Sequence, residues 1–232
     1  MTGFTDVHAH FLYGIDDGPQ TAREMEQMLD AAYADQVRAL FATPHMIPGL
    51  EPFDMELYQT RLDQARAYCA ARGYDMKIYG GAEIMYNPAM TNAVINRTLV
   101  TLAQSDYLLT ELLPDVSFSE LRDAVWQIER AGYVCVLAHI ERYACLYHPR
   151  IYELKKRHDI RYQINCASVV GSRGFLRDRF IKKWFEDGLI DFVASDAHNC
   201  STRPTRMSAA YKLLKQRYGA LYAGKLTGLS DQ

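Results

Sequence analysis

Five of the seven histidines stand at or just past the end of a short β-type run, and carboxylates accompany them. The histidines are His8, His10, His45, His139 and His198, and the carboxylates are Asp6, Asp17, Glu83, Glu111 and Asp196. Residues i and i+2 of a strand face the same side, so His8 and His10 can point together. One histidine near a strand end is ordinarily a packing residue. Five with carboxylates indicate a shared site at the carboxyl ends of the strands, where α/β proteins bind ligands.

Imidazoles and carboxylates without thiolates are donors that suit Zn²⁺, Mn²⁺ and Fe²⁺. About ten donors exceed the roughly four to six that one ion takes, so we expect two or three ions that share bridging carboxylates. Such clusters lower the pKa of a bound water and hold both the attacking and the leaving oxygen of an in-line phosphoryl displacement. The pattern therefore predicts metal-assisted hydrolysis of a phosphoester.

Two arginines follow the histidines closely enough to bind a phosphate. Arg142 comes three residues after His139, and Arg203 comes five after His198. A guanidinium presents a fork of donors that matches two phosphate oxygens. The alternative is that each arginine pairs with a local acid, with Glu141 as the obvious partner of Arg142.

Seven β-type runs alternate with segments of helical character. The runs cover 4–8, 39–43, 77–82, 107–112, 134–138, 162–166 and 192–195, and clear helical patterns cover 19–36, 118–131 and 175–185. This order predicts an α/β fold with parallel strands, either a barrel or an open doubly wound sheet. No Gly-x-Gly-x-x-Gly follows the first run, which disfavours dinucleotide binding. His148 and His158 are expected within helical segments.

The chain has 232 residues and a net charge of −2, which predicts one domain over residues 1–232 and gives no drive toward nucleic acid. It holds no apolar run of about 18 residues and no signal-peptide pattern, so we expect no membrane span. Five widely spaced cysteines indicate reduced thiols and a cytoplasmic location. Residues 142–183 hold 11 bases and 3 acids, either as solvated helix faces or as a surface for an anionic partner.

Six segments together resemble the polymerase-and-histidinol-phosphatase (PHP) superfamily. More narrowly, they resemble the bacterial manganese-dependent tyrosine-protein phosphatases of capsule and exopolysaccharide operons. The segments are Asp-Val-His-Ala-His (6–10), Gly-Ile-Asp-Asp-Gly-Pro (14–19), Ala-Thr-Pro-His (42–45), Gly-Ala-Glu-Ile (81–84), Ala-His-Ile-Glu-Arg-Tyr (138–143) and Ala-Ser-Asp-Ala-His-Asn (194–199). The resemblance runs from residue 6 to about 206, and the second and fifth segments are its most specific parts.

The resemblance implies a distorted (β/α)7 TIM-like barrel with three metal ions, manganese being the expected ion and Fe²⁺ or Zn²⁺ the alternatives. By motif position, the first ion would be held by His8, His10, Glu83 and Asp196. Glu83 would bridge to a second ion on Glu111 and His139, and Asp17, His45 and His198 would hold a third. Arg142 and Arg203 would grip the phosphate. Ile140 replaces a proline that is usual in the family, and Met46 stands where relatives often carry a polar or basic residue.

The resemblance also implies a mechanism and a substrate. A metal-bridging hydroxide would attack phosphotyrosine on a partner tyrosine kinase that regulates capsular or extracellular polysaccharide synthesis. A homo-oligomer contact through 31–38, expected as part of the first helix, would follow relatives.

Three other interpretations stay open on the sequence alone. Cys200 and Arg206 satisfy the C-x5-R pattern of cysteine-nucleophile phosphatases, although the loop has Pro204 and no glycine to wrap a phosphate. A small-molecule phosphomonoesterase such as histidinol phosphatase would use the same metals. The third interpretation is a catalytically silent binding module, which is disfavoured because every expected metal position holds a competent donor. Four aromatics could stack on a phenyl ring at the site, or merely pack: Phe11, Tyr13, Tyr86 and Tyr143.

Overall fold

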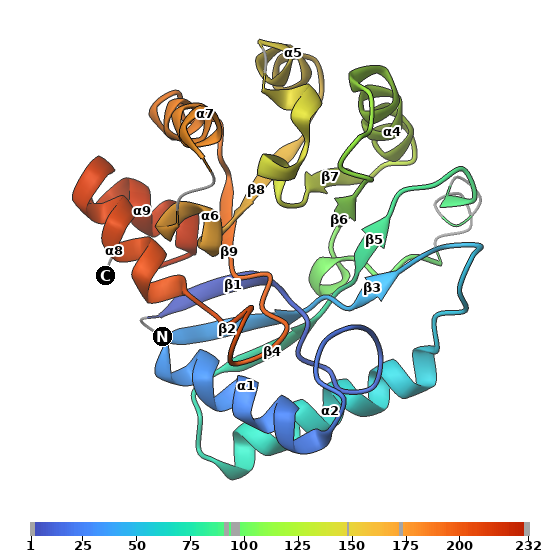
Figure 1. Cartoon of the computed structure of the whole chain (residues 1–232). Coiled ribbons are helices and arrows are strands. Elements are labelled where there is room, and N and C mark those ends of the chain that lie inside the picture. Colours follow the sequence, from blue (N-terminus) through green and yellow to red (C-terminus); the bar gives the residue numbers. More distant parts are fainter. Residues whose placement is uncertain (1–2, 91–92, 94–97, 148, 172–173, 230–232) are drawn as a thin grey trace.

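The computed structural model describes residues 3–90, 93, 98–147, 149–171 and 174–229, and it has parallel strands at its centre with helices around them (Figure 1). The strands are β1 (Phe4–Ala9), β2 (Val37–Ala42), β3 (His45–Met46), β4 (Lys77–Gly80), β5 (Glu83–Met85), β6 (Tyr107–Glu111), β7 (Val134–Leu137), β8 (Arg161–Asn165) and β9 (Phe192–Ala194).

Two of the seven expected strands, 39–43 and 77–82, are each followed at once by a short further strand that was not expected. Only Thr43 and Pro44 separate β2 from β3, and only Gly81 and Ala82 separate β4 from β5. One sheet has the order β1-β2-β4 and the other β3-β5-β6-β7-β8-β9, with parallel pairing throughout. The chain passes from the first sheet to the second at both breaks, so the two sheets form one curled layer.

The curled layer closes between β9 and β1, at the carboxyl ends of the strands. An isolated parallel bridge pairs Ala9 with Ala197. Two backbone bonds of 2.8 Å support it, from His10 N to Ala197 O and from Asp196 N to His8 O. The segments that close the barrel are therefore the ones that carry predicted metal ligands.

Helices follow the strands in chain order and cover the outside of the layer (Figure 1). They are α1 (Ala22–Ala34), α2 (Met55–Ala71), α4 (Phe118–Arg130), α5 (Arg150–Arg157), α6 (Cys166–Val170), α7 (Phe175–Glu186), α8 (Met207–Tyr218) and α9 (Ala220–Thr227), with 3-10 turns η1 (Leu102–Gln104), η2 (Ile140–Arg142) and η3 (Ala144–Leu146). A capping box of Thr21 and Glu24 starts α1, which buries Met25, Met28 and Leu29 against the strands.

A small apolar cluster supports the site from beneath. Leu102, Leu109, Val136 and Ala138 form it, apart from the main core between strands and helices. Leu109 lies two residues before Glu111 and so faces the same side of β6. The interior of the barrel is thus apolar below and polar at the carboxyl ends.

The expected α/β barrel architecture is confirmed, with some differences in detail. Residues 31–38 were expected to belong to the first helix, but α1 ends at Ala34 and β2 begins at Val37, so that expectation is wrong. His158 caps α5 with extended backbone rather than lying within a helix, and His148 lies outside the described residues. Within the described ranges, no helix has both the length and the apolar character needed to cross a bilayer.

Candidate metal centre

The nine predicted metal ligands lie together at the carboxyl ends of the strands. His8 lies on β1, His45 on β3, Glu83 on β5 and Glu111 on β6, whereas His10, Asp17, His139, Asp196 and His198 lie in the loops after β1, β7 and β9. All are buried except Asp17 and the half-buried His45. That these side chains bind metal ions remains a prediction.

Asp17 reaches the cluster because the loop after β1 turns tightly. Gly14 has a φ of +68°, a conformation that glycine adopts freely, and its N–H donates to Pro19 O at 2.9 Å. A Cβ on Gly18 would lie 2.6 Å from His10 O. The two glycines of the Gly-Ile-Asp-Asp-Gly-Pro segment therefore allow the loop to fold back over the site.

The first group is the predicted set of His8, His10, Glu83 and Asp196. One ligand atom from each lies within 4.8 Å of the others. Glu83 Oε2 is 3.1 Å from Nε2 of both histidines. Asp196 Oδ1 lies 3.5 Å from His8 Nε2 and 3.7 Å from His10 Nε2. Two imidazoles and two carboxylates thus face one buried point.

The second group surrounds the other oxygen of Glu83. His139 Nε2 lies 2.7 Å from Glu83 Oε1 and 3.5 Å from Glu111 Oε2. His45 Nδ1 also reaches this group, at 3.0 Å from Glu111 Oε1 and 3.3 Å from Glu83 Oε2. Glu83 therefore faces both groups, as the family resemblance implied, and His45 approaches two groups instead of one.

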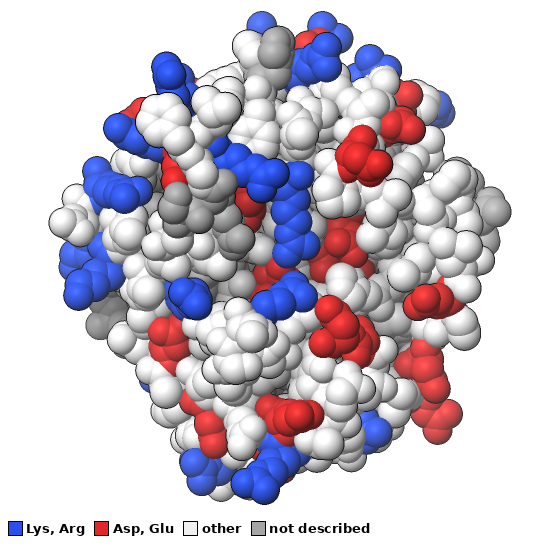
Figure 2. All heavy atoms as spheres, in the orientation of Figure 1, with Lys and Arg blue, Asp and Glu red and all other residues white. Residues whose placement is uncertain are grey.

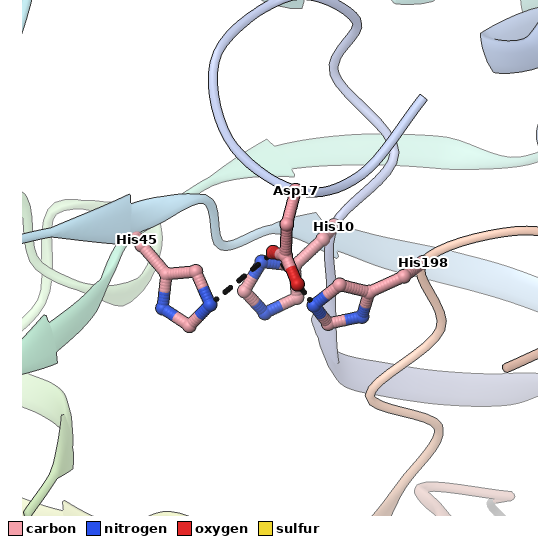
Figure 3. A group of neighbouring side chains, drawn as sticks. All are labelled: His10, Asp17, His45 and His198. Carbon is pink, nitrogen blue, oxygen red and sulfur yellow. Dashed lines mark ion pairs between the residues drawn. The ribbon is translucent and has the colours of Figure 1, made fainter. Parts of the chain in front are cut away.

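The third group contains the predicted Asp17, His45 and His198, together with His10 (Figure 3). Asp17 Oδ1 lies 3.2 Å from His198 Nε2 and 3.4 Å from His45 Nε2. The rings of His10 and His198 stack with their centroids 3.9 Å apart. The three groups share members, so they form one continuous centre.

The arrangement fits divalent metal ions. His198 Nδ1 lies 3.0 Å from the Asp196 carbonyl oxygen, which can only accept, so Nδ1 carries the proton and Nε2 keeps its lone pair. That buried Nε2 forms no hydrogen bond within the described part of the chain. It lies 3.2 Å from Asp17 Oδ1, so that two acceptors face each other, an arrangement that a cation between them would stabilise. The mixture of nitrogen and oxygen donors suits Mn²⁺, Fe²⁺ and Zn²⁺ alike.

Electrostatics within the centre are dominated by the carboxylates. Burial lowers the pKa of His10, but hydrogen bonds to Asp16 and Glu83 outweigh it and raise the pKa to about 9. Burial also lowers the pKa of His45, but the hydrogen bond to Glu111 and the charge of Glu83 outweigh burial and raise this pKa to about 9. Burial and the positive His10 lower the pKa of His198 to about 4 despite Asp196. The protein therefore concentrates negative charge where cations would bind.

Both predicted phosphate-binding arginines lie at this centre, on the same carboxylate. Arg142 Nη2 donates to Asp196 Oδ2 at 2.5 Å, and Arg203 Nη2 donates to Asp196 Oδ1 at 3.0 Å. Arg203 Nη1 also donates to Asp17 Oδ2 at 3.3 Å. Their side chains are 40% and 38% exposed. Solvent, and hence a phosphate, can reach both guanidinium groups.

The alternative pairing of Arg142 with Glu141 is wrong. The Glu141 carboxylate is buried and accepts from Asn165 N at 3.1 Å and from Ser168 Oγ at 2.7 Å. It thus anchors the end of β8 instead of neutralising the arginine.

The wider face around the centre is charged unevenly. Figure 2 shows acidic side chains in the middle of the face that Figure 1 presents, with more basic side chains on the side of α5, α7, α8 and α9. Several bases of 142–183 are paired locally: Lys155 with Asp191, and Arg157 with Glu153. Arg177 is exposed, and its guanidinium lies 6.0 Å from the centre of the Tyr147 ring.

Two of the four aromatics that could have stacked on a substrate only pack. Phe11 and Tyr143 are buried in the core, and the Tyr143 hydroxyl accepts from Leu112 N at 3.0 Å. They pack, and cannot stack on a substrate. Tyr13 and Tyr86 are partly exposed and remain candidates.

Three polar residues of the site were missed in the sequence. Asp16 accepts from His10 Nδ1 at 2.7 Å, from His45 N at 3.1 Å and, through Oδ1, from Gly18 N at 3.0 Å. Burial raises its pKa, but the His10 hydrogen bond outweighs this and lowers it to about 2. Gln163 and Asn165 of β8 also contact predicted ligands. The adjacent aspartates of Gly-Ile-Asp-Asp-Gly-Pro could have indicated Asp16, whereas nothing in the sequence distinguishes the two amides.

Two ligand positions have unusual backbone conformations. His139 and Asp196 have φ of +34° and +52°, in the left-handed region that residues with a Cβ seldom adopt. Such conformations cluster at functional sites. Each lies two residues after the end of a strand, where the turn directs the side chain toward the centre.

The protein is thus an α/β barrel with a candidate metal centre, formed by three overlapping groups of imidazoles and carboxylates at the strand ends. The whole chain matches a family as well: the model of the capsular polysaccharide synthesis CpsB/CapC family matches residues 4–229. The chain belongs to the CpsB/CapC family.

Named relatives agree with this membership. The chain is 31% identical over 228 residues to the tyrosine-protein phosphatase CpsB of Streptococcus pneumoniae, with 95% of this chain and 93% of the relative covered. It is 27% identical over 224 residues to the tyrosine-protein phosphatase YwqE of Bacillus subtilis, with 93% and 85% covered.

Solved structures extend the comparison to the fold. A chain from the crystal structures of YwqE and CpsB, described as metal-dependent tyrosine phosphatases, superposes with a TM-score of 0.87 at 27% identity, covering 97% of this chain and 91% of that one. An organophosphorus hydrolase from Deinococcus radiodurans gives a TM-score of 0.63 at 11% identity, covering 98% and 91%, and shares the fold alone.

Proposed function

We propose that this chain is a metal-dependent protein-tyrosine phosphatase, a phosphoric monoester hydrolase that acts in the synthesis of capsular or extracellular polysaccharide. The observation that carries the proposal is the convergence of nine imidazole and carboxylate donors with two exposed guanidiniums at one end of the barrel. The names of its CpsB and YwqE relatives support the substrate class.

Three overlapping ligand sets would hold the ions. His8, His10, Glu83 and Asp196 would hold one, Glu83 with Glu111 and His139 a second, and Asp17, His45 and His198 a third. Divalent ions, when bound, supply a hydrolytic nucleophile at neutral pH and offset negative charge on the phosphoryl group. We expect two or three ions, with manganese as the preferred one.

The side chains of the chain itself bind and orient the substrate. Arg142 and Arg203 donate to phosphoryl oxygens, where a guanidinium fork holds two oxygens and neutralises charge that develops in the transition state. Asp196 accepts from both arginines and so fixes their spacing. The tyrosyl oxygen is a better leaving group than an alkyl alkoxide because the pKa of tyrosine is about 10.

The proposed substrate is a phosphotyrosine on a partner protein, specifically a bacterial tyrosine kinase that regulates polysaccharide synthesis, and the proposed location of this chain is the cytoplasm. A phosphorylated tyrosine carries a charge of about −1.5 to −2 at neutral pH. The bases of 142–183 and the exposed Arg177 near Tyr147 offer a complementary surface beside the arginines of the site. A homo-oligomer is also proposed, without an assigned contact surface.

The test compares two substrates at equal concentration with added Mn²⁺: a phosphotyrosine peptide and histidinol phosphate. Elemental analysis of the same preparation records the metal content. The proposal expects manganese-dependent turnover with kcat/KM higher for the peptide. A preference for histidinol phosphate would replace the proposed substrate with a small molecule, and absence of turnover on both with metal bound would refute the enzyme.

A further inference from the structure

Strand β8 carries none of the proposed metal ligands, and neither do β2 and β4. Residues 161–165 of β8 are all described, and the strand lies between β7 and β9, whose following loops each contribute ligands. Gln163 and Asn165 are two residues apart and both buried, so they face the same side of this strand. That side is the interior, because Gln163 contacts His8 of β1 across the barrel.

These two amides form a continuous chain of hydrogen bonds between ligands on three other strands. Gln163 Oε1 lies 3.1 Å from His8 Nδ1 and 2.8 Å from His139 N. Gln163 Nε2 donates to Asn165 Oδ1 at 2.9 Å, and Asn165 Nδ2 donates to Asp196 Oδ2 at 2.7 Å. The chain thus starts beside β1 and β7 and ends beside β9.

The direction of these hydrogen bonds is fixed independently at both ends. The backbone N–H of His139 can only donate, so Gln163 must present its oxygen to it. The carboxylate of Asp196 can only accept, so Asn165 must present its NH₂. Both requirements give the same orientation for the Gln163–Asn165 bond in the middle. If either side-chain amide were rotated by 180°, two donors or two acceptors would face each other, at His139 N for Gln163 or at the Asp196 carboxylate for Asn165.

We propose that Gln163 and Asn165 are positioning residues that set the metal-facing atoms of His8 and Asp196. Gln163 accepts a hydrogen bond from His8 Nδ1–H, which leaves Nε2, 3.1 Å from Glu83 Oε2, as the nitrogen that would face a metal ion. Asn165 donates to Oδ2 of Asp196 beside Arg142, so that Oδ1, to which Arg203 donates, is the oxygen that faces the two histidines of the first group. Partners that orient metal ligands in this way tune affinity strongly. The inference rests on the proposed metal centre and not on the identity of the substrate.

Two variants remove different parts of this chain. Asn165→Ala removes the amide donor to Asp196, which keeps its bonds from Arg142 and Arg203, and leaves Gln163 on His8. Gln163→Met, of similar size, removes the bonds to His8, to His139 N and to Asn165. Mn²⁺ affinity is measured by competition with a chelating dye, beside thermal unfolding. We expect a loss of affinity of about 10- to 100-fold, larger for Gln163→Met. The matched control is Val136→Ala, which shortens a buried side chain of the apolar cluster beneath the site, a cluster that contains none of the proposed ligands. It should lower Tm while leaving Mn²⁺ affinity unchanged.

A second measurement uses the unaltered protein. With Zn²⁺ as a diamagnetic probe, ¹⁵N NMR of the histidine side chains should show His8 coordinated through Nε2 and protonated at Nδ1. Coordination through Nδ1 would overturn the inference, as would Mn²⁺ affinities of the two amide variants equal to that of Val136→Ala. If the unaltered protein binds neither ion, the metal centre and the proposed function fail together. If it binds them and the variants do too, only the positioning role fails.

Discussion

Arg142 donates to Asp196 Oδ2 at 2.5 Å, so a residue proposed to grip phosphate is held by a residue proposed to hold a metal. Arg203 donates to the other oxygen of the same carboxylate at 3.0 Å. Oδ1 also faces His8 Nε2 at 3.5 Å. Asp196 is therefore the link between the phosphate-binding and the metal-binding parts of the site, and the two parts can be separated by substitution.

Arg203→Ala should lower kcat/KM for a phosphotyrosine peptide by about 10²- to 10³-fold, because one donor to the developing charge is lost. Metal content should stay at the wild-type level, because Asp196 keeps its bonds from Arg142 and Asn165 on Oδ2. Kinetics and elemental analysis on one preparation check both statements. Arg206→Ala, an exposed arginine of the same loop, is the matched control and should keep activity. Loss of metal in Arg203→Ala would contradict its assigned role.

Asp196→Ala should instead cost metal and activity together. The substitution removes a proposed ligand of the first group. It also removes the carboxylate that accepts hydrogen bonds from Arg142, Arg203 and Asn165. His139→Ala should behave alike, since His139 Nε2 lies 2.7 Å from Glu83. Metal-to-protein ratios after dialysis, measured beside turnover, give the answer. A variant that retained full metal content while losing turnover would move that residue out of the ligand set.

Cys200→Ser should retain most of the activity, and a chelator should abolish it. A nucleophilic cysteine needs a lowered pKa, whereas burial raises the pKa of Cys200 and nearby Asp30 adds to the rise. Its side chain is exposed on the surface of the loop. Peptide turnover with and without chelator, followed by Mn²⁺ re-addition, checks this. If Cys200→Ser were inactive and the wild-type protein kept its activity in the presence of the chelator, the C-x5-R mechanism would be established instead.

The position of the nine donors was predictable because strand ends are local features of the sequence. A histidine or acid just after a β-type run faces the carboxyl end of a parallel barrel wherever the strand stands in the order. His8 and Glu83 are 75 positions apart in the chain, yet their contact at 3.1 Å follows from that rule. The barrel itself followed from the alternation of runs and helical segments.

Pairings within the site were not predictable, because they depend on which loops lie side by side. Arg142 neighbours Glu141 in sequence, but the 3-10 turn η2 sends the two side chains to different partners. Gln163 and Asn165 belong to an ordinary strand pattern and carry no charge. Their importance arises only when β8 is inserted between β7 and β9.

Arg177→Glu should raise KM for a phosphotyrosine peptide with acidic flanking residues by about two- to fivefold, as expected for one exposed charge. It should leave the turnover of para-nitrophenyl phosphate unchanged, because the small substrate does not reach α7. Arg23→Glu on α1, exposed on another part of the molecule, is the control. Raising the salt concentration should erase the difference. Equal KM values for the acidic peptide in all three proteins at low salt would remove this surface from substrate binding.

Mn²⁺ affinity should rise with pH up to about 9. A metal needs an unprotonated imidazole nitrogen, and in the metal-free protein the pKa of both His10 and His45 is raised to about 9. Binding at pH 7 must therefore displace protons, and affinity should gain up to about tenfold per pH unit for each proton released. Calorimetry in two buffers of different ionisation enthalpy counts those protons. Binding without proton release at pH 7 would contradict the raised values.

The same groups set how the stability of the metal-free protein depends on pH. The folded-state pKa of His10 and His45, about 9, lies above the ordinary value of 6.5, so folding favours their protonated forms. Their contribution is complete below pH 6.5 and is lost as pH rises through 9. His198, with a pKa of about 4, stays neutral across this window. Tm of the metal-free protein should thus fall between pH 6.5 and 9, while the stabilisation gained from saturating Mn²⁺ grows, because the ions replace the lost protons among the carboxylates.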